Sequence, residues 1–391
     1  MMIIRHIVSF ACGVGAAVAL TLSGMTDPRT IWQFFTLTRP LPLLVFFGLT
    51  LAIYTVFQQH IFHKRCSTPL FAERFAWQHS IPSLVDVDLI TGSVLFGLGW
   101  AITGLCPGPA LVAAATGSLP GLLTLCGTVL GIGITVLVKH RHTVNNGMFT
   151  HLVRPPPRVI TIKLATFVFV ATYLLHFGYY HPVSHPTPPP HPIIAESNVN
   201  GTGIPSPPAP ANYDDNGVNE SSTLLLSSSS PYFFFSNPPI GILRTLSAAL
   251  VMGLSLAIFT LTTGRVFGFS GILRQFFFTV SGTGHTNDDP VGIFAAVMGI
   301  LSGAWIGQHL LSNNGAYHDY HSHVGSTNGL EIFFFGGILI GTGSTLANGC
   351  TSGHGICGVA RFSRRSIVAI GLFMVSAFVF THMTHSSLRR I

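Results

Sequence analysis

Residues 92–110 read GSVLFGLGWAITGLCPGPA, and residues 336–354 read GGILIGTGSTLANGCTSGH. Each stretch is an apolar segment that ends in glycines, small polar residues and one cysteine. Aligned at a constant offset of 244, the two stretches share five identities, which pair Gly92 with Gly336, Leu95 with Leu339, Gly97 with Gly341, Gly99 with Gly343 and Cys106 with Cys350. The chain therefore carries an internal repeat, and each copy interrupts a membrane-length segment near its cysteine.

The composition identifies an integral membrane protein. The chain has 391 residues, of which 48% are hydrophobic and only 8% are charged, and its mean hydropathy is +0.56. A soluble globule of this size needs far more charged residues to cover its surface. The net charge of +7 includes no basic stripe interleaved with aromatic residues. We therefore expect the lipid bilayer, and not nucleic acid, as a partner.

Several apolar segments are each long enough to cross about 30 Å of hydrocarbon as a helix. They lie near residues 5–24, 42–59, 88–105, 119–138, 159–180, 240–263, 291–311, 330–347 and 366–385. The sequence lacks the period-2 alternation of barrel strands, so we expect an all-α polytopic protein with about nine transmembrane helices. The first segment begins near the N-terminus like a signal peptide, but the repeat requires it in the fold.

A segment rich in Pro and Ser, residues 181–238, separates two membrane halves at 1–180 and 239–391. It contains HPVSHPTPPPHP and no Lys or Arg, a composition typical of a disordered linker. Two N-glycosylation motifs begin at Asn200 and Asn219, and such motifs are usable only outside the cytosol. We therefore expect the linker on the extracytosolic side.

Basic residues predict the orientation. They cluster in four loops, which contain Lys64, Arg65 and Arg74; Lys139, Arg141, Arg154 and Arg158; Arg265 and Arg274; and Arg361, Arg364 and Arg365. By the positive-inside rule these loops face the cytosol, as does the N-terminus. The span that ends at Cys106 then runs outward, and the span that ends at Cys350 runs inward. We therefore expect two inverted repeats, as in many transporters, in the plasma membrane.

Each repeated cysteine precedes a segment too short to cross the bilayer. Residues 107–116 follow Cys106, and residues 351–359 follow Cys350. Pro in a first turn and Ser or Thr near a cap favour a new helix start. We therefore expect a broken helix and a short re-entrant half-helix in each repeat. The N-terminus of such a half-helix presents N–H groups and a positive dipole end, which favour an anion.

The thiols narrow the class of ligand. An oxyanion alone needs only hydroxyl and N–H groups, whereas a cysteine at a helix N-terminus can donate a hydrogen bond, ligate a soft atom or attack it. A sulfur-containing anion and Cu(I) both fit such thiols. Cu(I) fits less well, because Met25 is the only methionine near the expected path and positive dipole ends repel cations. His354 is a candidate to bind the anion or to titrate with pH, with a structural role as the alternative.

The two motifs resemble the YeeE/YedE family of sulfur transport proteins. The second half carries GGILIGTGSTLANGCTSGHGICGVARFSRRSIVA, which is close to the family signature. The first half, through LSGMTDP (22–28) and DLITGSVLFGLGWAITGLCPGPA (88–110), resembles a partner module that bacteria often encode separately and that is fused here. The resemblance implies an inverted-repeat bundle that imports thiosulfate for sulfur assimilation, with no enzymatic step, cofactor or metal site.

The family's mechanism implies that cysteines along a narrow path pass thiosulfate on by transient S–H···S contacts. We expect Cys106 at the outer constriction and Cys350 at the inner one. Family members of the fused type carry a further cysteine near the first-span turn, where this chain has Ser23-Gly24-Met25. The expected path residues are Cys106, Cys350, Pro107, Gly108, Thr351, Ser352, Gly353, His354, Gly99, Gly343, Ser23 and Met25.

Other roles compete with this interpretation. The glycines of residues 341–355 could serve helix packing alone. A membrane-bound sulfurtransferase or persulfide carrier would use Cys350 as a covalent nucleophile, and a soft-metal permease would use both thiols as ligands. A cytosolic sulfur-carrier protein is a candidate partner of a thiosulfate importer.

Overall fold

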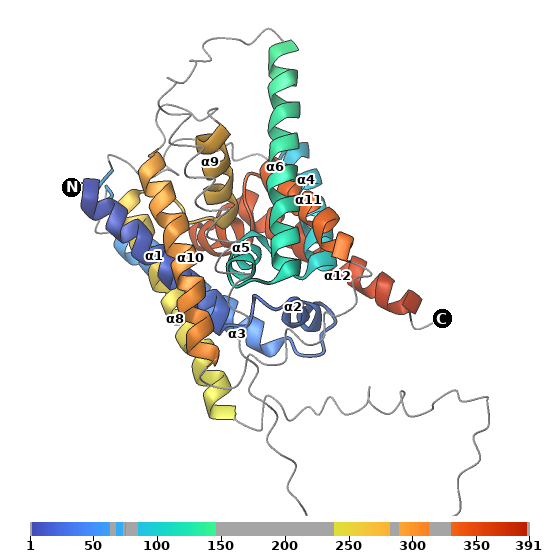
Figure 1. Cartoon of the computed structure of the whole chain (residues 1–391), viewed down its shortest axis with the longest axis horizontal. Helices are drawn as coiled ribbons and strands as arrows, with labels where there is room; N and C mark the ends of the chain where they lie inside the picture. Colours follow the sequence, from blue (N-terminus) through green and yellow to red (C-terminus); the bar gives the residue numbers. More distant parts are fainter. Residues whose placement is uncertain are drawn as a thin grey trace, which may run out of the picture. The chain divides into compact units, whose positions relative to one another are not determined.

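A computed structural model describes residues 2–62, 68–72, 75, 85–145, 238–281, 289–312 and 330–388. In chain order the elements are α1 (Met2–Leu22), α2 (Pro28–Phe35), α3 (Leu41–Val56) with a π-helical end (Phe57–Phe62), α4 (Val87–Thr103), α5 (Pro107–Ala115), α6 (Leu119–Asn145), α8 (Pro238–Thr263), α9 (Phe269–Ser281), α10 (Pro290–Ser312), α11 (Leu330–Ala347), the π-helix η6 (Thr351–Gly358), the short η7 (Val359–Arg361) and α12 (Arg364–Leu388) (Figure 1). The span expected at 159–180, and the linker up to residue 237, lie outside the described residues.

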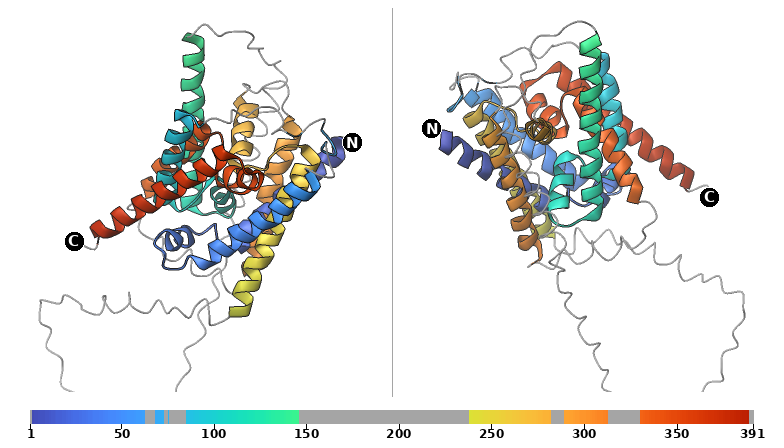
Figure 2. Two further views of the ribbon diagram at one scale, coloured as in Figure 1. Left: turned by 180° about the vertical axis from the view of Figure 1, so that it is seen from behind. Right: turned by 45° about the horizontal axis from the view of Figure 1, so that its top comes forward.

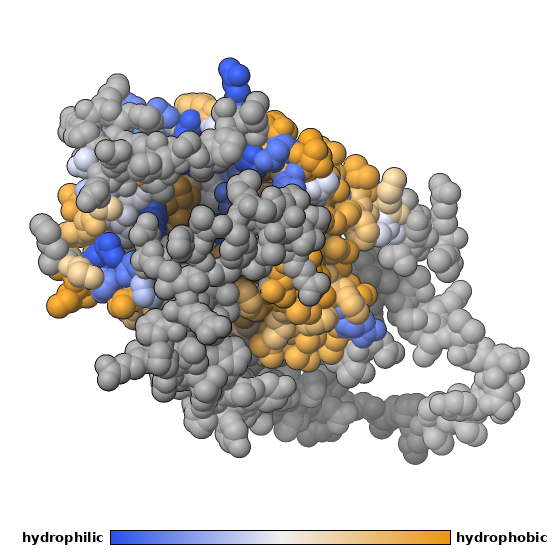
Figure 3. Space-filling model, turned by 90° about the horizontal axis from the view of Figure 1, so that it is seen from above, coloured by the Kyte–Doolittle hydropathy of each residue, from blue (hydrophilic) through white to orange (hydrophobic). Residues whose placement is uncertain are grey.

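Eight helices in the described part of the chain are long and apolar enough to cross a membrane, and they match the other eight expected spans. Large apolar side chains on these helices are exposed, among them Ile7, Leu137, Leu243 and Val375. Figure 3 shows apolar side chains gathered over the described helices on the face that it draws. An apolar surface of this extent is typical of contact with lipid. The all-α polytopic membrane fold is confirmed.

Glycines bring α4, α6, α11 and α12 into backbone contact, because a glycine has no side chain to hold two helices apart. The order of the contacts gives the directions: α4 and α11 run antiparallel, whereas α6 runs parallel to α11 and α12 runs parallel to α4. The contacts pair Gly92 with Gly343, Gly99 with Gly336, Thr124 with Gly337, Thr128 with Gly341, and Gly97 with Phe373. The ion pair of Asp86 and Arg365, at 3.1 Å, joins the beginnings of α4 and α12.

The remaining long helices form two further parallel pairs. Helix α1 runs along α10 (Figure 1), and α3 runs along α8, as the view from behind shows (Figure 2). The contacts of the first pair join Arg5 to Asp289, Val14 to Gly303 and Thr21 to Gly307. Those of the second pair join Thr50 to the Ala249 carbonyl at 3.4 Å and Tyr54 to Thr260 at 3.1 Å.

These helix pairings are the ones expected of two inverted repeats, because exchanging the two halves turns each pair into an observed pair. Helices α1, α3, α4 and α6 correspond in order to α8, α10, α11 and α12. The pair α1 and α10 becomes α8 and α3 when the halves are exchanged, and the pair α4 and α12 becomes α11 and α6. The equivalent helices α4 and α11 run in opposite directions, so the exchange inverts the fold. The inverted repeat expected from the sequence is confirmed.

Two short helices, α2 and α9, were not expected from the sequence. They have 8 and 13 residues, too few to cross a bilayer, so a search for apolar spans passes over them. Asp27 caps α2 by accepting a hydrogen bond from the Arg29 N–H at 2.9 Å, and Pro28 occupies its first turn. Both helices follow the first long helix of their half, so they also belong to the repeat.

Candidate functional site

Both broken helices stop at a residue in the left-handed conformation. Gly104 ends α4 with a φ of 65°, and Asn348 follows α11 with a φ of 61°. Glycine adopts this φ at little cost, and asparagine adopts it more readily than most residues. Gly104 and Asn348 are 244 positions apart, the same offset as Cys106 and Cys350. The repeat therefore extends to the backbone geometry of the break.

Cys106 and Cys350 are the N-caps of the two half-helices, α5 and η6. Both have an extended backbone, and neither makes a side-chain cap hydrogen bond. Their carbonyls accept the first helical hydrogen bonds, from the N–H groups of Ala110 at 2.9 Å and His354 at 2.8 Å. The expected half-helices are present, and η6 is π-helical, a rare form that often occurs at functional sites.

Hydroxyl groups lie beside both thiols. The Thr351 hydroxyl donates a hydrogen bond to Cys106 Sγ at 3.6 Å and so links the two half-helices directly. The Ser352 Oγ lies 3.2 Å from Cys350 Sγ, and it accepts a hydrogen bond from the Phe269 N–H at 3.3 Å. The N-termini of half-helices from opposite repeats thus meet at one point in the protein interior.

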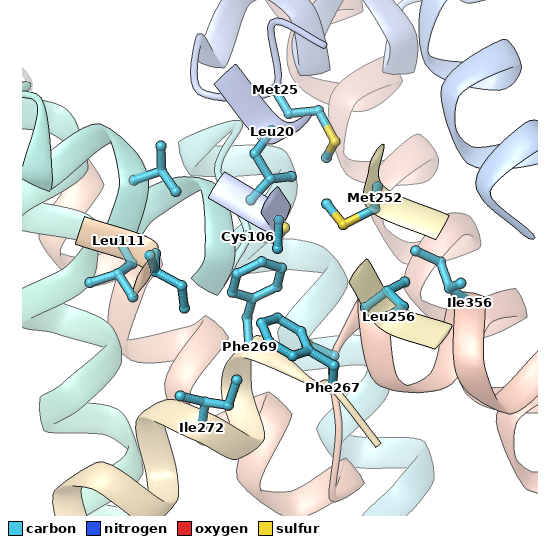
Figure 4. Close-up of a cluster of buried hydrophobic side chains, with 14 of the residues drawn as sticks. Leu20, Met25, Cys106, Leu111, Met252, Leu256, Phe267, Phe269, Ile272 and Ile356 are labelled. Atoms are coloured by element: carbon cyan, nitrogen blue, oxygen red, sulfur yellow. The ribbon is translucent and has the colours of Figure 1, made fainter. Parts of the chain in front are cut away.

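A narrow cavity, the central cavity, lies at this meeting point. Its volume is about 20 Å³, room for roughly one water molecule. It is lined by Leu20, Met25, Phe46, Phe47, Cys106, Gly108, Pro109, Met252, Phe269, Cys350, Thr351, Ser352 and Ile356. Figure 4 shows Cys106 between Leu20 and Phe269, with Met25 and Met252 beside it. The lining is apolar apart from sulfur, hydroxyl and backbone atoms.

Backbone donors are unequal at the two half-helix ends. Proline has no N–H group, so α5, which begins Pro107-Gly108-Pro109, offers only the Gly108 N–H in its first three positions. The first turn of η6, residues 351–353, contains no proline, and its N–H groups precede the first helical bond made by His354. An anion would therefore find more donors at the Cys350 end of the central cavity.

The central cavity gathers half of the expected path residues. These are Met25, Cys106, Gly108, Cys350, Thr351 and Ser352. We expected the two cysteines at separate outer and inner constrictions, whereas both line this one cavity. Met25, in the turn after α1, is one of the lining residues, at the position where the family resemblance implied a cysteine in other members.

The other expected path residues lie outside the lining of the central cavity. Gly99 and Gly343 lie where α4 crosses α11, and an added Cβ would be 2.6 Å from a backbone oxygen at either position. The Ser23 hydroxyl donates to the Leu20 carbonyl at 2.9 Å. Pro107 is buried in the first turn of α5, and an added Cβ on Gly353 would meet no atom within 4 Å.

His354 bridges three elements. Its Nε2 lies 3.1 Å from the Ala347 carbonyl oxygen, and its Nδ1 lies 3.0 Å from Ser366 Oγ. A carbonyl can only accept, so Nε2 carries the proton, and Nδ1 of the neutral ring accepts from the serine hydroxyl. Both nitrogen atoms are thus occupied in joining α11, η6 and α12. This arrangement favours the structural alternative for His354.

Several lining residues were not found from the sequence. Phe269 contacts both half-helices: its ring lies against Gly108, where an added Cβ would be 2.6 Å away, and its N–H bonds to Ser352. Met252 of α8 also lines the cavity. The expectation that Met25 would be the only methionine near the path is therefore wrong. Neither residue belongs to a motif, and phenylalanine and methionine are unremarkable in apolar spans.

A second, larger cavity, the vestibule, opens beside the α11 break. It has a volume of about 360 Å³ and is lined by Asp86, Asp88, Val136, Lys139, Arg274, Phe278, Thr345, Leu346, Asn348 and Arg365. Asn348 accepts a hydrogen bond from Arg274 at 2.8 Å and lies two residues before Cys350. The vestibule therefore reaches the break whose other end lines the central cavity.

Ion pairs organise the charges of the vestibule. Lys139 lies 2.8 Å from Asp88, and Arg365 lies 3.1 Å from Asp86. Slight burial acts to raise the pKa of Asp86, but hydrogen bonds from Arg365 and the Leu89 N–H, together with the arginine charge, outweigh it and hold the pKa below its usual value. Both aspartates have a basic partner, and Arg274 is the third basic residue of the lining. The vestibule has one excess positive charge and suits an anion.

Comparison with known proteins gives the family. Residues 28–379 match the family described as Sulphur transport, so the match runs through both halves. A "Probable transporter" of Xylella fastidiosa strain 9a5c is 33% identical over 135 residues, which are 33% of this chain and 88% of that protein. A "Probable transporter" of strain Temecula1 / ATCC 700964 is 33% identical over 135 residues, 33% of this chain and 86% of its own length. The chain belongs to the sulphur transport family and is an integral membrane transporter rather than an enzyme.

Proposed function

We propose that this transporter imports thiosulfate, or a related anion with a terminal sulfur, for sulfur assimilation. The main support is that Cys106 and Cys350, the N-caps of half-helices from opposite repeats, line one cavity. Two helix N-termini directed at one point favour negative charge there, each by about 0.3–2 kcal/mol. Two thiols at the same point suit a ligand that also carries a soft sulfur atom.

A thiosulfate ion would interact with different groups at its two ends. Its oxygen atoms would accept hydrogen bonds from the hydroxyl and N–H groups of Thr351 and Ser352. Its terminal sulfur would accept a hydrogen bond from the thiol of Cys106 or Cys350. Sulfate lacks this sulfur atom and would leave the thiols without a matching acceptor. The contacts are transient, so no covalent bond forms or breaks during passage.

Phe269 is the proposed gate of the path. The central cavity, at about 20 Å³, is too small for thiosulfate, which is several times larger than a water molecule. Phe269 contacts Gly108 at the start of α5 and Ser352 at the start of η6. Withdrawal of its ring, with the start of α9, would open the space between the half-helices.

The vestibule is the proposed continuation of the path on the cytosolic side. By the positive-inside rule, the side that carries Lys139, Arg274 and Arg365 faces the cytosol. The anion would leave the Cys350 end of the central cavity past Asn348 and enter a space with an excess positive charge. We propose the plasma membrane as the location and a cytosolic sulfur-carrier protein as the recipient.

Uptake of radiolabelled thiosulfate, in a host that cannot import it, tests the proposal. Wild type should restore uptake, and Cys106→Ala and Cys350→Ala should each reduce it about tenfold or more, because a hydrogen bond to a charged group contributes about 1.5–3 kcal/mol. Cys126→Ala is the matched control, because Cys126 is exposed on α6 and outside the cavity lining. Uptake that survives both cavity substitutions would contradict the thiol-lined path.

The same experiment separates transport from sulfur transfer. A transporter delivers thiosulfate intact, so the label should be recovered inside the cells as thiosulfate. A sulfurtransferase would instead move the terminal sulfur of thiosulfate onto the Cys350 thiolate and release sulfite, and mass spectrometry of the purified protein detects the resulting persulfide. A persulfide on Cys350 with no intracellular thiosulfate would favour the enzyme.

A further inference from the structure

Four sulfur atoms line the central cavity. Cys106 and Cys350 contribute thiols, and Met25 and Met252 contribute thioethers. All four residues are at most 5% exposed. They come from four separate places in the fold: the turn after α1, helix α8 and the two helix breaks. Figure 4 shows Met25, Met252 and Cys106 turned toward the same space.

The four sulfur atoms favour one class of metal ion. Thiolate and thioether sulfur are the ligands that soft cations such as Cu(I) select, whereas hard cations prefer oxygen. Within the described residues no group of three or more His, Cys, Asp or Glu could hold a metal ion. The two methionines are therefore needed to complete a sulfur-ligated site.

We propose that the central cavity binds one soft monovalent cation, Cu(I) or Ag(I), through Cys106, Cys350, Met25 and Met252. The volume of about 20 Å³ admits a bare ion without any widening, although it excludes thiosulfate. The cation would therefore occupy the closed form of the transporter.

The charge balance answers the objection that helix N-termini repel cations. Binding of one monovalent cation by two thiols releases two protons to water and leaves a complex of two thiolates and one cation, with a net charge of −1. The half-helix N-termini at Cys106 and Cys350 each carry about half a positive charge. They therefore stabilise the complex as a whole, since it is an anion like the proposed substrate.

Binding has a functional consequence that rests on the proposed thiosulfate path. A cation held by both half-helices ties Cys106 to Cys350 and keeps the cavity closed. Ag(I) should therefore inhibit uptake, and an excess of a small thiol should restore it by removing the ion. The binding itself does not depend on which anion the protein carries.

Titration of the purified full-length protein with Ag(I), in competition with a small thiol, tests the site. Wild type should bind one ion tightly, with an affinity that falls as the pH is lowered because protons compete for both thiolates. Met25→Leu and Met252→Leu should each weaken binding about tenfold or more, since even the loss of an outer-shell partner costs about 10–100-fold. X-ray absorption should show sulfur neighbours only.

Matched controls separate this site from other thiols and from misfolding. The two leucine variants keep all six cysteines. In each, an apolar leucine side chain replaces a methionine side chain of similar volume, so that only the sulfur ligand is lost. Met298→Leu alters a partly buried methionine of α10 that is outside the cavity lining, and it should bind like wild type. Equal Ag(I) affinity in wild type and both cavity variants, or no tight site in wild type, would overturn the proposal. Tight binding by a wild type that takes up no thiosulfate would instead contradict only the proposed transport.

Discussion

Gly104 and Asn348 show how single residues position the two thiols of the central cavity. Each turns the chain out of a long helix through the left-handed region, and each is followed two residues later by a cysteine that starts a half-helix. The direction in which the two thiols face therefore depends on a backbone conformation that few residues adopt readily.

Gly104→Ala should destabilise the protein by about 1–3 kcal/mol, because a left-handed conformation is strained for alanine. The added Cβ would also lie 2.6 Å from the Pro28 carbonyl oxygen. The thermal unfolding midpoint of the purified protein measures the effect. Gly371→Ala on α12 is the control, because its Cβ would meet no atom within 4 Å, and alanine favours a helix. An unfolding midpoint for Gly104→Ala as high as that of the control would contradict this account of the break.

Residue type alone did not separate the residues that line the central cavity from those that pack helices together. Gly108 lines the central cavity, whereas Gly99 and Gly343, predicted with it, lie where α4 crosses α11. The same property, the absence of a side chain, serves both purposes. A glycine motif therefore predicts that space is left beside the helix backbone. Only the fold decides whether a second helix fills that space or a cavity remains there.

At the scale of elements, residues of the two half-helices and of α9 line the central cavity. The sequence predicted α5 and η6, because glycine and a cysteine interrupt each apolar span within a few residues, together with proline at α5 and with threonine and serine at η6. It did not predict that α9 would contact both of them through Phe269. Helix α9 has 13 residues, which is too short to be recognised by apolar length in a search for transmembrane spans.

Arg274 of α9 should affect how readily the anion occupies the vestibule. Arg274→Gln removes a positive charge beside Asn348, and unit charges about 4 Å apart interact by ~1 kcal/mol in water. We expect the KM for thiosulfate uptake to rise about fivefold at low salt and less at high salt, where the charge is screened. Arg364→Gln carries the same change of charge at an exposed position outside the vestibule lining. An equal rise in KM in both variants would argue against a specific role of Arg274.

At the scale of the whole molecule, parallel and antiparallel pairings show that the halves are inverted copies. The pairings also fix which loops share a side. The loop between α2 and α3 lies on the side where α1 ends, and the beginning of α12 lies on the opposite side, where α4 begins. The positive-inside rule then predicts that the side on which α4 and α12 begin faces the cytosol.

Cysteine labelling in intact cells tests this orientation. Thr38→Cys, at an exposed position between α2 and α3, should react with a membrane-impermeant maleimide added outside. Arg364→Cys, at the exposed start of α12, should react only after the membrane is permeabilised. Wild type gives the background from the native cysteines. The reverse pattern would show that the protein is inserted the other way round.

The sequence by itself determined the spans, the positions of the breaks and the internal repeat. These features depend on local quantities: apolar length, the backbone freedom of glycine, the missing N–H of proline, and an identity offset along one chain. The tertiary structure alone decided that Met252 and Phe269 join Cys106 and Cys350 at one cavity, and that His354 faces Ser366. Such convergence depends on how helices far apart in sequence cross, and no local pattern encodes the crossing.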